Sequence, residues 1–219
     1  TPQAVREMRR AGVQRVSVSL DGSYAERHDA IRGVPGAFDA AVRGMRYCLE
    51  GGLPFQVNTT VMRQNVDDLE AIHRLVISLG ADAWHVFMLV PTGRGKELEA
   101  EELSPEEYEQ ILNWVYDKQA ELGDKIFFKP TDAPHYMRVV LQRDRKENLN
   151  KLKREGHPLS SITRGCLAGT GFCFISYRGD VQGCGYLEVK AGNIREEGFS
   201  KIWAESPLFR DLRDLSNIK

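Results

Sequence analysis

A chain of 219 residues with 42% hydrophobic content can bury a sizeable core, so one large domain with an appended module is expected. The 30 basic and 31 acidic residues nearly cancel, and no basic stripe with interleaved aromatic residues occurs, which argues against a nucleic-acid partner. No apolar run approaches the roughly 20 residues of a membrane span, and no signal peptide is seen, so we expect a cytoplasmic protein without a membrane partner. The chain starts at Thr1, directly at a helix-start signal, and we expect it to be a piece of a longer protein.

Helix and strand patterns alternate over the first 130 residues. Strands are predicted at residues 16–20, 55–61, 84–90 and 126–128, separated by helices that begin near Thr1, Phe38, Asn65 with Asp68, and Ser104. The last of these helices has the serine, proline and glutamate of a capping box. Repeated βα units of this kind predict parallel strands.

Two of these strands are polar on one face and aliphatic on the other. The polar faces consist of Ser17, Ser19 and Asp21 in the first strand and of Gln56, Asn58 and Thr60 in the second. Parallel strands with helices outside and polar side chains inside are typical of a barrel wall whose lumen holds a polar ligand. A pair of strands at a sheet edge is the alternative.

Two cysteines bracket a predicted β-hairpin. Cys166 is followed after twelve residues by Gly179 and after four more by Cys184, and the strand-like runs 172–177 and 180–182 meet at Gly179. Two thiolates on the flanks of one hairpin suit an iron–sulfur site. A disulfide is disfavoured in a cytosolic chain, and zinc is disfavoured because the cysteines are not spaced in close pairs. The spacing alone leaves metal binding and coincidence open.

The other two cysteines are predicted not to bind metal. Cys48 shares the apolar helical face of Phe38, Ala41 and Met45, as a buried small hydrophobic residue would. Cys173 lies inside the first strand of the hairpin rather than at its flanks.

Residues 16–22 (VSVSLDG), 28–33 (HDAIRG) and 57–61 (VNTTV) resemble the middle strands of radical S-adenosylmethionine (SAM) enzymes. The resemblance implies an α/β fold: residues 1–130 form the C-terminal half, the fourth to sixth βα units, of a partial (β/α)6 barrel, and residues 131–160 form a helical connector. In that family the first strand carries a three-cysteine loop that binds the catalytic [4Fe-4S] cluster. The chain has no such loop, so we expect it to be inactive alone. The catalytic residues are therefore not assigned from this sequence.

Residues 161–219 resemble the start of the auxiliary-cluster extension of the same family, the SPASM or twitch domain. Cys166 and Cys184 match two ligands of its [4Fe-4S] cluster. Asn193, Phe199 and Trp203 match the helix that follows the hairpin.

A narrower resemblance rests on residues 85–95 (HVFMLVPTGRG), 133–136 (APHY) and 165–172 (GCLAGTGF). These segments look like the tetrapyrrole branch of radical SAM enzymes. Within this branch the resemblance favours the heme b synthase of the siroheme-dependent pathway. It implies oxidative decarboxylation of two propionates of a tetrapyrrole substrate, iron-coproporphyrin III. It also implies an electron donor as a partner. The alternatives are propionate removal in d-type heme biosynthesis, a peptide-modifying SPASM enzyme, and a non-catalytic tetrapyrrole- or metal-binding module.

The resemblance also implies roles for single residues. S-adenosylmethionine is expected to contact Ser19, Arg32, Asn58 and Leu89. Cationic or polar side chains at the barrel mouth are expected to bind the anionic substrate, and these are Arg94, His135, Tyr136 and Arg138. The alternative for Ser19 and Asn58 is hydrogen bonding to neighbouring backbone, for Arg32 it is a surface charge, and for His135 it is a structural hydrogen bond. Residues 93–95 are not a dinucleotide fingerprint, because the third glycine and the following helix are missing.

Overall fold

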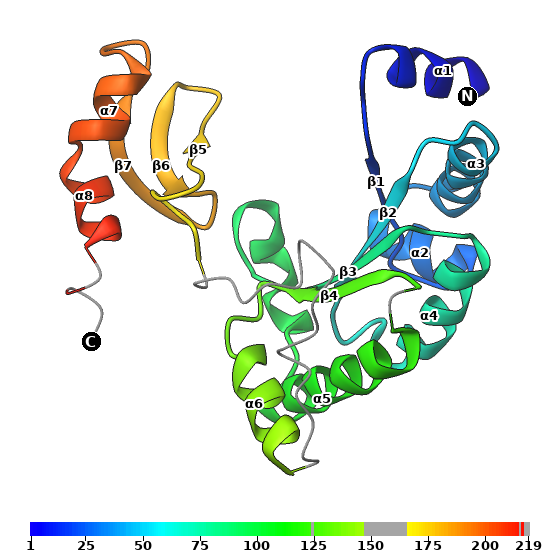
Figure 1. Cartoon of the computed structure of the whole chain (residues 1–219). Coiled ribbons are helices and arrows are strands. Elements are labelled where there is room, and N and C mark those ends of the chain that lie inside the picture. The colour runs from blue at the N-terminus through cyan, green and yellow to red at the C-terminus, as the bar shows by residue number, and fades with distance from the viewer. Residues whose placement is uncertain (124, 147–165, 215, 217–219) are drawn as a thin grey trace. The chain divides into compact units, whose positions relative to one another are not determined.

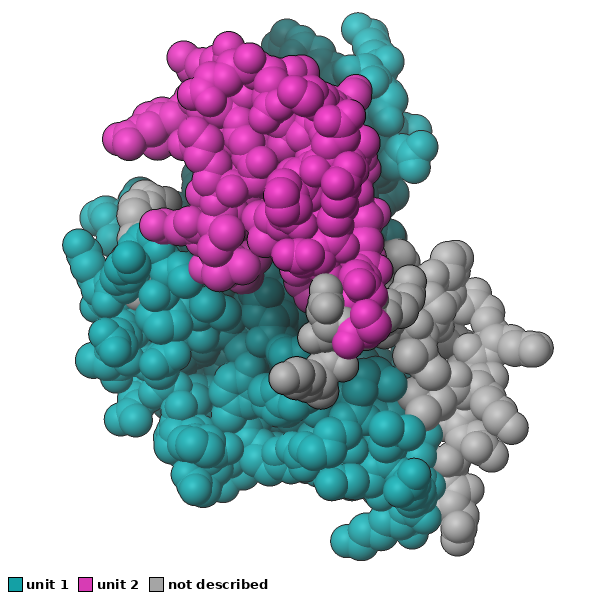
Figure 2. Space-filling model, turned by 90° about the vertical axis from the view of Figure 1, so that its left-hand side faces the viewer, with its two compact units in different colours: residues 1–160 teal, residues 161–219 magenta. Residues whose placement is uncertain are grey.

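The computed structural model describes residues 1–123, 125–146, 166–214 and 216, and these fall into two compact units. Figure 2 colours the units, residues 1–160 and residues 161–219. The predicted helical connector groups with the first unit, where its described part contains one helix; residues 147–160 of the connector lie outside the described ranges. Within those ranges no helix is long and apolar enough to cross a membrane.

A parallel sheet forms the centre of the first unit. Its strands are β1 (Val16–Ser19), β2 (Phe55–Val61), β3 (Ala83–Met88) and β4 (Phe127–Thr131), and they are ordered as they follow one another in the chain. Each strand pairs in parallel with the next. The predicted α/β fold with parallel strands is therefore confirmed. Figure 1 shows helices on one side of β3 and β4, as expected for part of a barrel wall.

Helices connect the strands. They are α1 (Pro2–Arg10), α2 (Ala25–Arg32), α3 (Ala37–Glu50), the short 3-10 helix η1 (Val66–Asp68), α4 (Leu69–Ser78), the 3-10 segment η2 (Gly93–Glu101), α5 (Pro105–Leu122) and α6 (Tyr136–Lys146). The predicted start signals of α1 and α5 are confirmed, since Thr1 caps α1 and Ser104 forms a capping box with Glu107. The predicted helix start near Asn65 and Asp68 is confirmed, since these residues directly precede η1 and α4, although neither side chain makes a capping hydrogen bond. The Asn65 side chain instead bonds to backbone groups of Asp21, Thr60 and Met62.

The helices cover one face of the sheet. Along β2 the residues alternate, with Phe55, Val57, Thr59 and Val61 buried and the polar residues between them half-buried. Thr59 is a polar residue on the buried face that the pattern did not anticipate. Its hydroxyl donates to the Leu20 carbonyl (2.7 Å) and accepts from Trp84 Nε1 (2.9 Å), so burial leaves it satisfied. The opposite face of the sheet keeps the predicted polar side chains.

The second unit is a small antiparallel sheet with two helices. Its strands are β5 (Phe174–Ile175), β6 (Asp180–Cys184) and β7 (Leu187–Asn193), followed by α7 (Phe199–Glu205) and α8 (Pro207–Arg213). The core consists of Val181, Ile202 and Phe209, with Cys173, Ala191, Trp203 and Leu212 packed against them. The predicted hairpin is confirmed by the β5–β6 pairing, while β7 is an additional strand that the pattern missed.

Gly179 and Asn193 fix the hairpin turn. Gly179 has φ of +88°, and a Cβ at this position would lie 2.8 Å from Asn193 Oδ1, so only glycine fits. Asn193 Nδ2 donates to the Arg178 carbonyl (3.2 Å) and to Asp180 Oδ1 (2.9 Å). The placement of Asn193 in the following helix is therefore wrong: it is the last residue of β7, whereas Phe199 and Trp203 do lie in α7.

Candidate cofactor and substrate sites

Three of the four residues expected to contact S-adenosylmethionine lie on neighbouring strands. Ser19 ends β1 and is the direct Cα partner of Asn58 in β2, and both belong to the polar face. Leu89 follows β3 and its backbone N–H donates to the Val61 carbonyl (3.3 Å). The strand order thus brings Ser19 and Asn58 together, whereas Leu89 lies beyond the carboxyl end of β3, past His85, the partner of Asn58.

The fourth residue, Arg32, already has a carboxylate partner. Its Nη2 lies 2.5 Å from Oδ2 of the buried Asp21, and 37% of the Arg32 side chain is exposed. Burial raises the pKa of Asp21, while the charge of Arg32 opposes that rise. Asp21 also accepts from the Thr60 N–H (2.8 Å), so Arg32 is held at the carboxyl ends of β1 and β2 with part of its side chain open to solvent.

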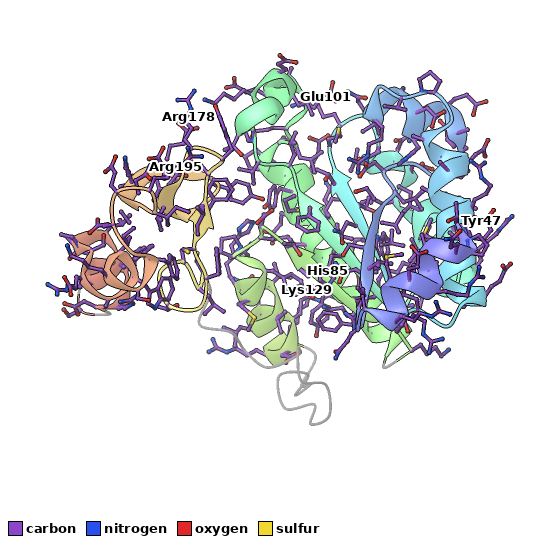
Figure 3. All side chains as sticks on the ribbon, turned by 90° about the horizontal axis from the view of Figure 1, so that it is seen from above. Tyr47, His85, Glu101, Lys129, Arg178 and Arg195 are labelled. Atoms are coloured by element: carbon purple, nitrogen blue, oxygen red, sulfur yellow. The ribbon has the colours of Figure 1, made fainter. Side chains whose placement is uncertain are left out.

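Sequence reasoning missed two residues of the polar face, His85 in β3 and Lys129 in β4. His85 is the Cα partner of both Asn58 and Lys129, and Figure 3 labels the two missed residues on their neighbouring strands. The signal was available, because each lies at an alternate strand position between apolar neighbours. Burial and the positive charges of Lys129 and Arg15 lower the pKa of His85 to about 4, so this imidazole is neutral near pH 7.

The neutral His85 predicts a pH dependence of stability. Its pKa falls from 6.5 in the unfolded chain to about 4 in the fold, so the unfolded state binds more protons between these values. The free energy of unfolding should therefore be highest above pH 6.5 and fall as the pH decreases toward 4. Urea denaturation at several pH values should show a shallower slope for His85→Gln than for wild type. Some slope should persist, because burial also lowers the pKa values of His28 and His73; an unchanged slope would contradict the prediction.

The residues expected to bind the substrate lie at and beyond the end of β4 and in η2. His135 is exposed and its ring lies 4.7 Å from that of Tyr108. Arg138 is exposed on α6 and pairs with Glu109 of α5, which holds the pKa of the glutamate below its ordinary value. Arg94 belongs to η2, and its side chain lies outside what the structure describes.

Tyr136, the remaining predicted substrate residue, is buried. Only 8% of it is exposed, and its hydroxyl donates to Gln119 Oε1 (2.6 Å). Burial raises the pKa of the phenol well above its ordinary value. In this structure Tyr136 packs in the core of the first unit, and its role toward a substrate stays a prediction.

The two predicted cluster ligands lie at the flanks of the hairpin in the second unit. Cys166 is exposed, and its Sγ accepts a hydrogen bond from the Ala168 N–H (3.4 Å). Cys184 ends β6 and is half-buried. Free thiols of this kind, one of them already bonded to a backbone N–H, fit an iron–sulfur cluster, whose sulfurs commonly accept such bonds. The described residues hold no group of three or more His, Cys, Asp or Glu side chains placed around one metal ion.

The other two cysteines lie in apolar surroundings. Cys48 is 5% exposed in the core of the first unit, and Cys173 packs against the core of the second. Burial raises the pKa of both thiols, which disfavours the thiolate that binds metal.

Known protein families match both units. The radical SAM superfamily matches residues 1–76, and the iron–sulfur cluster-binding domain called SPASM matches residues 166–219. The chain therefore has a radical SAM region and a SPASM region. These are families of enzymes and domains that use S-adenosylmethionine and [4Fe-4S] clusters.

Two similar proteins share the name AdoMet-dependent heme synthase. The protein from Methanosarcina barkeri is 48% identical over 219 residues, which is 100% of this chain and 61% of the relative. The protein from Oleidesulfovibrio alaskensis is 47% identical over 97% of this chain and 54% of its own length. The chain therefore spans a little over half the length of these relatives.

Solved structures support the fold. The crystal structure of Streptococcus suis SuiB bound to its precursor peptide SuiA superposes with a TM-score of 0.65 and 18% identity, over 91% of this chain and 44% of SuiB. At this identity the likeness concerns the fold alone. It agrees with the parallel sheet and the appended hairpin unit described above.

Proposed function

We propose that the full-length protein is a heme synthase that uses radical SAM chemistry to decarboxylate two propionates of iron-coproporphyrin III oxidatively, giving the vinyl groups of heme b. The observation that carries this proposal is the 48% identity over the entire chain to a protein named AdoMet-dependent heme synthase. The similarity extends through the polar face of the first unit and the hairpin of the second. Both candidate sites therefore lie within the aligned region.

The polar face of the first unit is the proposed S-adenosylmethionine site. The chemistry that S-adenosylmethionine and a reduced [4Fe-4S] cluster would supply here is removal of a hydrogen atom from the propionate. Ser19 and Asn58 offer polar groups from adjacent strands, and Leu89 offers an apolar contact at the carboxyl end of β3. Arg32 offers guanidinium N–H groups beyond the pair it forms with Asp21.

The proposed substrate is a large anion. The residues predicted at the barrel mouth offer it cationic and polar partners, and these are Arg94, His135, Tyr136 and Arg138. His135 is exposed for such contact. Arg138 has to share its charge with Glu109, so its contribution to binding should be smaller than that of an unpaired arginine. Arg94 completes the proposed set, and Tyr136 acts through Gln119 by fixing the start of α6.

The hairpin cysteines give the second unit its proposed role. Removing a hydrogen atom and carbon dioxide from a propionate leaves one electron to be carried away. Cys166 and Cys184 are proposed ligands of an auxiliary [4Fe-4S] cluster that would accept this electron, supported by their free thiols and the Ala168 N–H bond to Cys166 Sγ. An external electron donor is the further partner that this scheme requires.

An anaerobic turnover experiment tests the proposal. Full-length protein with reconstituted clusters should be incubated with iron-coproporphyrin III, S-adenosylmethionine and dithionite. We expect heme b, detected by mass, and deoxyadenosine in proportion to the propionates lost. Deoxyadenosine release without any change in tetrapyrrole mass would contradict the proposed substrate, whereas loss of carboxyl groups without vinyl formation would contradict the proposed product.

A further inference from the structure

One row of polar residues crosses all four strands of the first unit. Ser19, Asn58, His85 and Lys129 are successive Cα partners, one from each of β1 to β4. In a parallel sheet, residues in register lie on the same face, so the four side chains form a continuous line across the polar face. His85 and Lys129 have no role in the S-adenosylmethionine contacts proposed above.

Gln56 determines which hydrogen-bonding groups this row presents. Its Nε2 lies 2.6 Å from Asn58 Oδ1 and 3.0 Å from His85 Nδ1. An amide nitrogen only donates, so His85 Nδ1 accepts and the ring hydrogen of the neutral imidazole is on Nε2. Nε2 is buried and has no hydrogen-bond partner within the part of the chain that the structure describes. A buried N–H without a partner is costly, and in native proteins such a group is generally completed by a water or a ligand.

Lys129 gives the row a positive charge. No ion pair joins it to any described side chain, and its ammonium group is close enough to His85 to affect the imidazole electrostatically, as is the Arg15 guanidinium. The strand residues on this face of β1 to β4 include no aspartate or glutamate. Asp21, which continues this face just beyond β1, has its carboxylate paired with Arg32, so among the described residues no carboxylate neutralises Lys129.

We propose that His85 Nε2–H and the Lys129 ammonium together bind a carboxylate of the substrate. The inference rests on the proposed function, which makes that group a propionate of iron-coproporphyrin III. A carboxylate accepts from both donors at once, satisfies the buried N–H and neutralises Lys129. S-adenosylmethionine also has a carboxylate, and the experiment below separates the two sources.

The test compares binding to full-length variants that differ in one group. Lys129→Gln removes the charge, His85→Asn removes Nε2–H while keeping a polar side chain, and Lys129→Arg restores the charge. Lys125→Gln is the matched control, because Lys125 is an exposed lysine just before β4 whose charge is not among those that lower the pKa of His85. Dissociation constants for iron-coproporphyrin III, for its tetramethyl ester and for S-adenosylmethionine are measured separately, by optical titration and by equilibrium dialysis.

We expect Lys129→Gln to weaken binding of iron-coproporphyrin III by about tenfold or more, the scale of a hydrogen bond to a charged group. His85→Asn should weaken it by less, Lys129→Arg should restore most of it, and Lys125→Gln should change it less than twofold. The preference of wild type for the acid over the tetramethyl ester should decrease in Lys129→Gln, because one of the contacts to a carboxylate loses its charge. Binding of S-adenosylmethionine should be unchanged in every variant.

Two results would overturn the inference while leaving the proposed function intact. One is wild-type affinity for iron-coproporphyrin III in both Lys129→Gln and His85→Asn. The other is weakened binding of S-adenosylmethionine alone, which would assign the row to the carboxylate of the cofactor. Failure of wild type itself to bind iron-coproporphyrin III would instead overturn the proposed function together with this inference.

Discussion

Replacing Cys166 or Cys184 with serine in the full-length protein is expected to remove most of the iron held by the hairpin unit. The two thiols flank the hairpin that Gly179 closes, one at the end of β6 and one before β5. A serine hydroxyl is a poor ligand for iron in such clusters, so loss of one thiolate should release the cluster or leave it labile. Iron content and visible absorption are measured after reconstitution, in a background that lacks the cysteines of the catalytic cluster.

Cys173→Ser is the matched control for this experiment. Cys173 belongs to the same hairpin, but it packs against the unit's core and burial raises the pKa of its thiol. The Cys173→Ser variant should keep its iron, as should the Cys48→Ala variant, which is altered in the first unit. Full iron content in both Cys166→Ser and Cys184→Ser would show that the hairpin is structural and does not bind the auxiliary cluster.

The sequence predicted the strands of the first unit well, because its signals there are local. Thr1 and the capping box at Ser104 act within one helical turn, and the alternation of β2 follows directly from the period of a strand. The helix α2 and the strand β7 were missed. In the exposed first half of β7, Leu187 and Val189 alternate with charged residues, a strand pattern that the sequence analysis did not use, while Ala191 in its second half packs against the core.

The site was harder to predict because its contacts join distant positions. The resemblance to radical SAM enzymes marked Ser19 and Asn58 as candidates, but their pairing follows from strand register, which no single strand specifies. Arg138 was expected to be free for a substrate, and its partner Glu109 is 29 positions earlier on another helix. Such a pair depends on how α5 packs against α6.

Asp21 illustrates how buried polar groups complete the site. Its backbone N–H donates to His28 Nδ1 (3.0 Å), its carboxylate accepts from the Thr60 N–H, and the same carboxylate holds Arg32. The ends of β1 and β2 and the last turn of α2 are thereby joined. A pattern of alternating polar residues indicated the polar face, yet the role of Asp21 as a support for Arg32 is visible only in three dimensions.

Trp84→Ala is expected to destabilise the first unit by about 3–5 kcal/mol, the usual cost of truncating a large buried aromatic side chain. Trp84 is 0% exposed, and its ring stacks on Phe128 with centroids 4.8 Å apart and on His73 at 5.7 Å. It also donates to Thr59, which links β3 to the buried face of β2. Urea denaturation followed by far-UV circular dichroism measures the loss.

Trp84→Phe separates packing from the hydrogen bond. It keeps an aromatic ring between Phe128 and His73 but removes the donor to Thr59, whose hydroxyl still bonds to Leu20, so a smaller loss of about 1–2 kcal/mol is expected. Similar losses for the two variants would show that the hydrogen bond, rather than the packing, dominates. Because His85 is the next residue along β3 and faces the opposite side, the packing of Trp84 also sets the position of His85 on the polar face. Trp84→Ala should therefore also weaken ligand binding at the polar face, although Trp84 lies on the other face of the sheet.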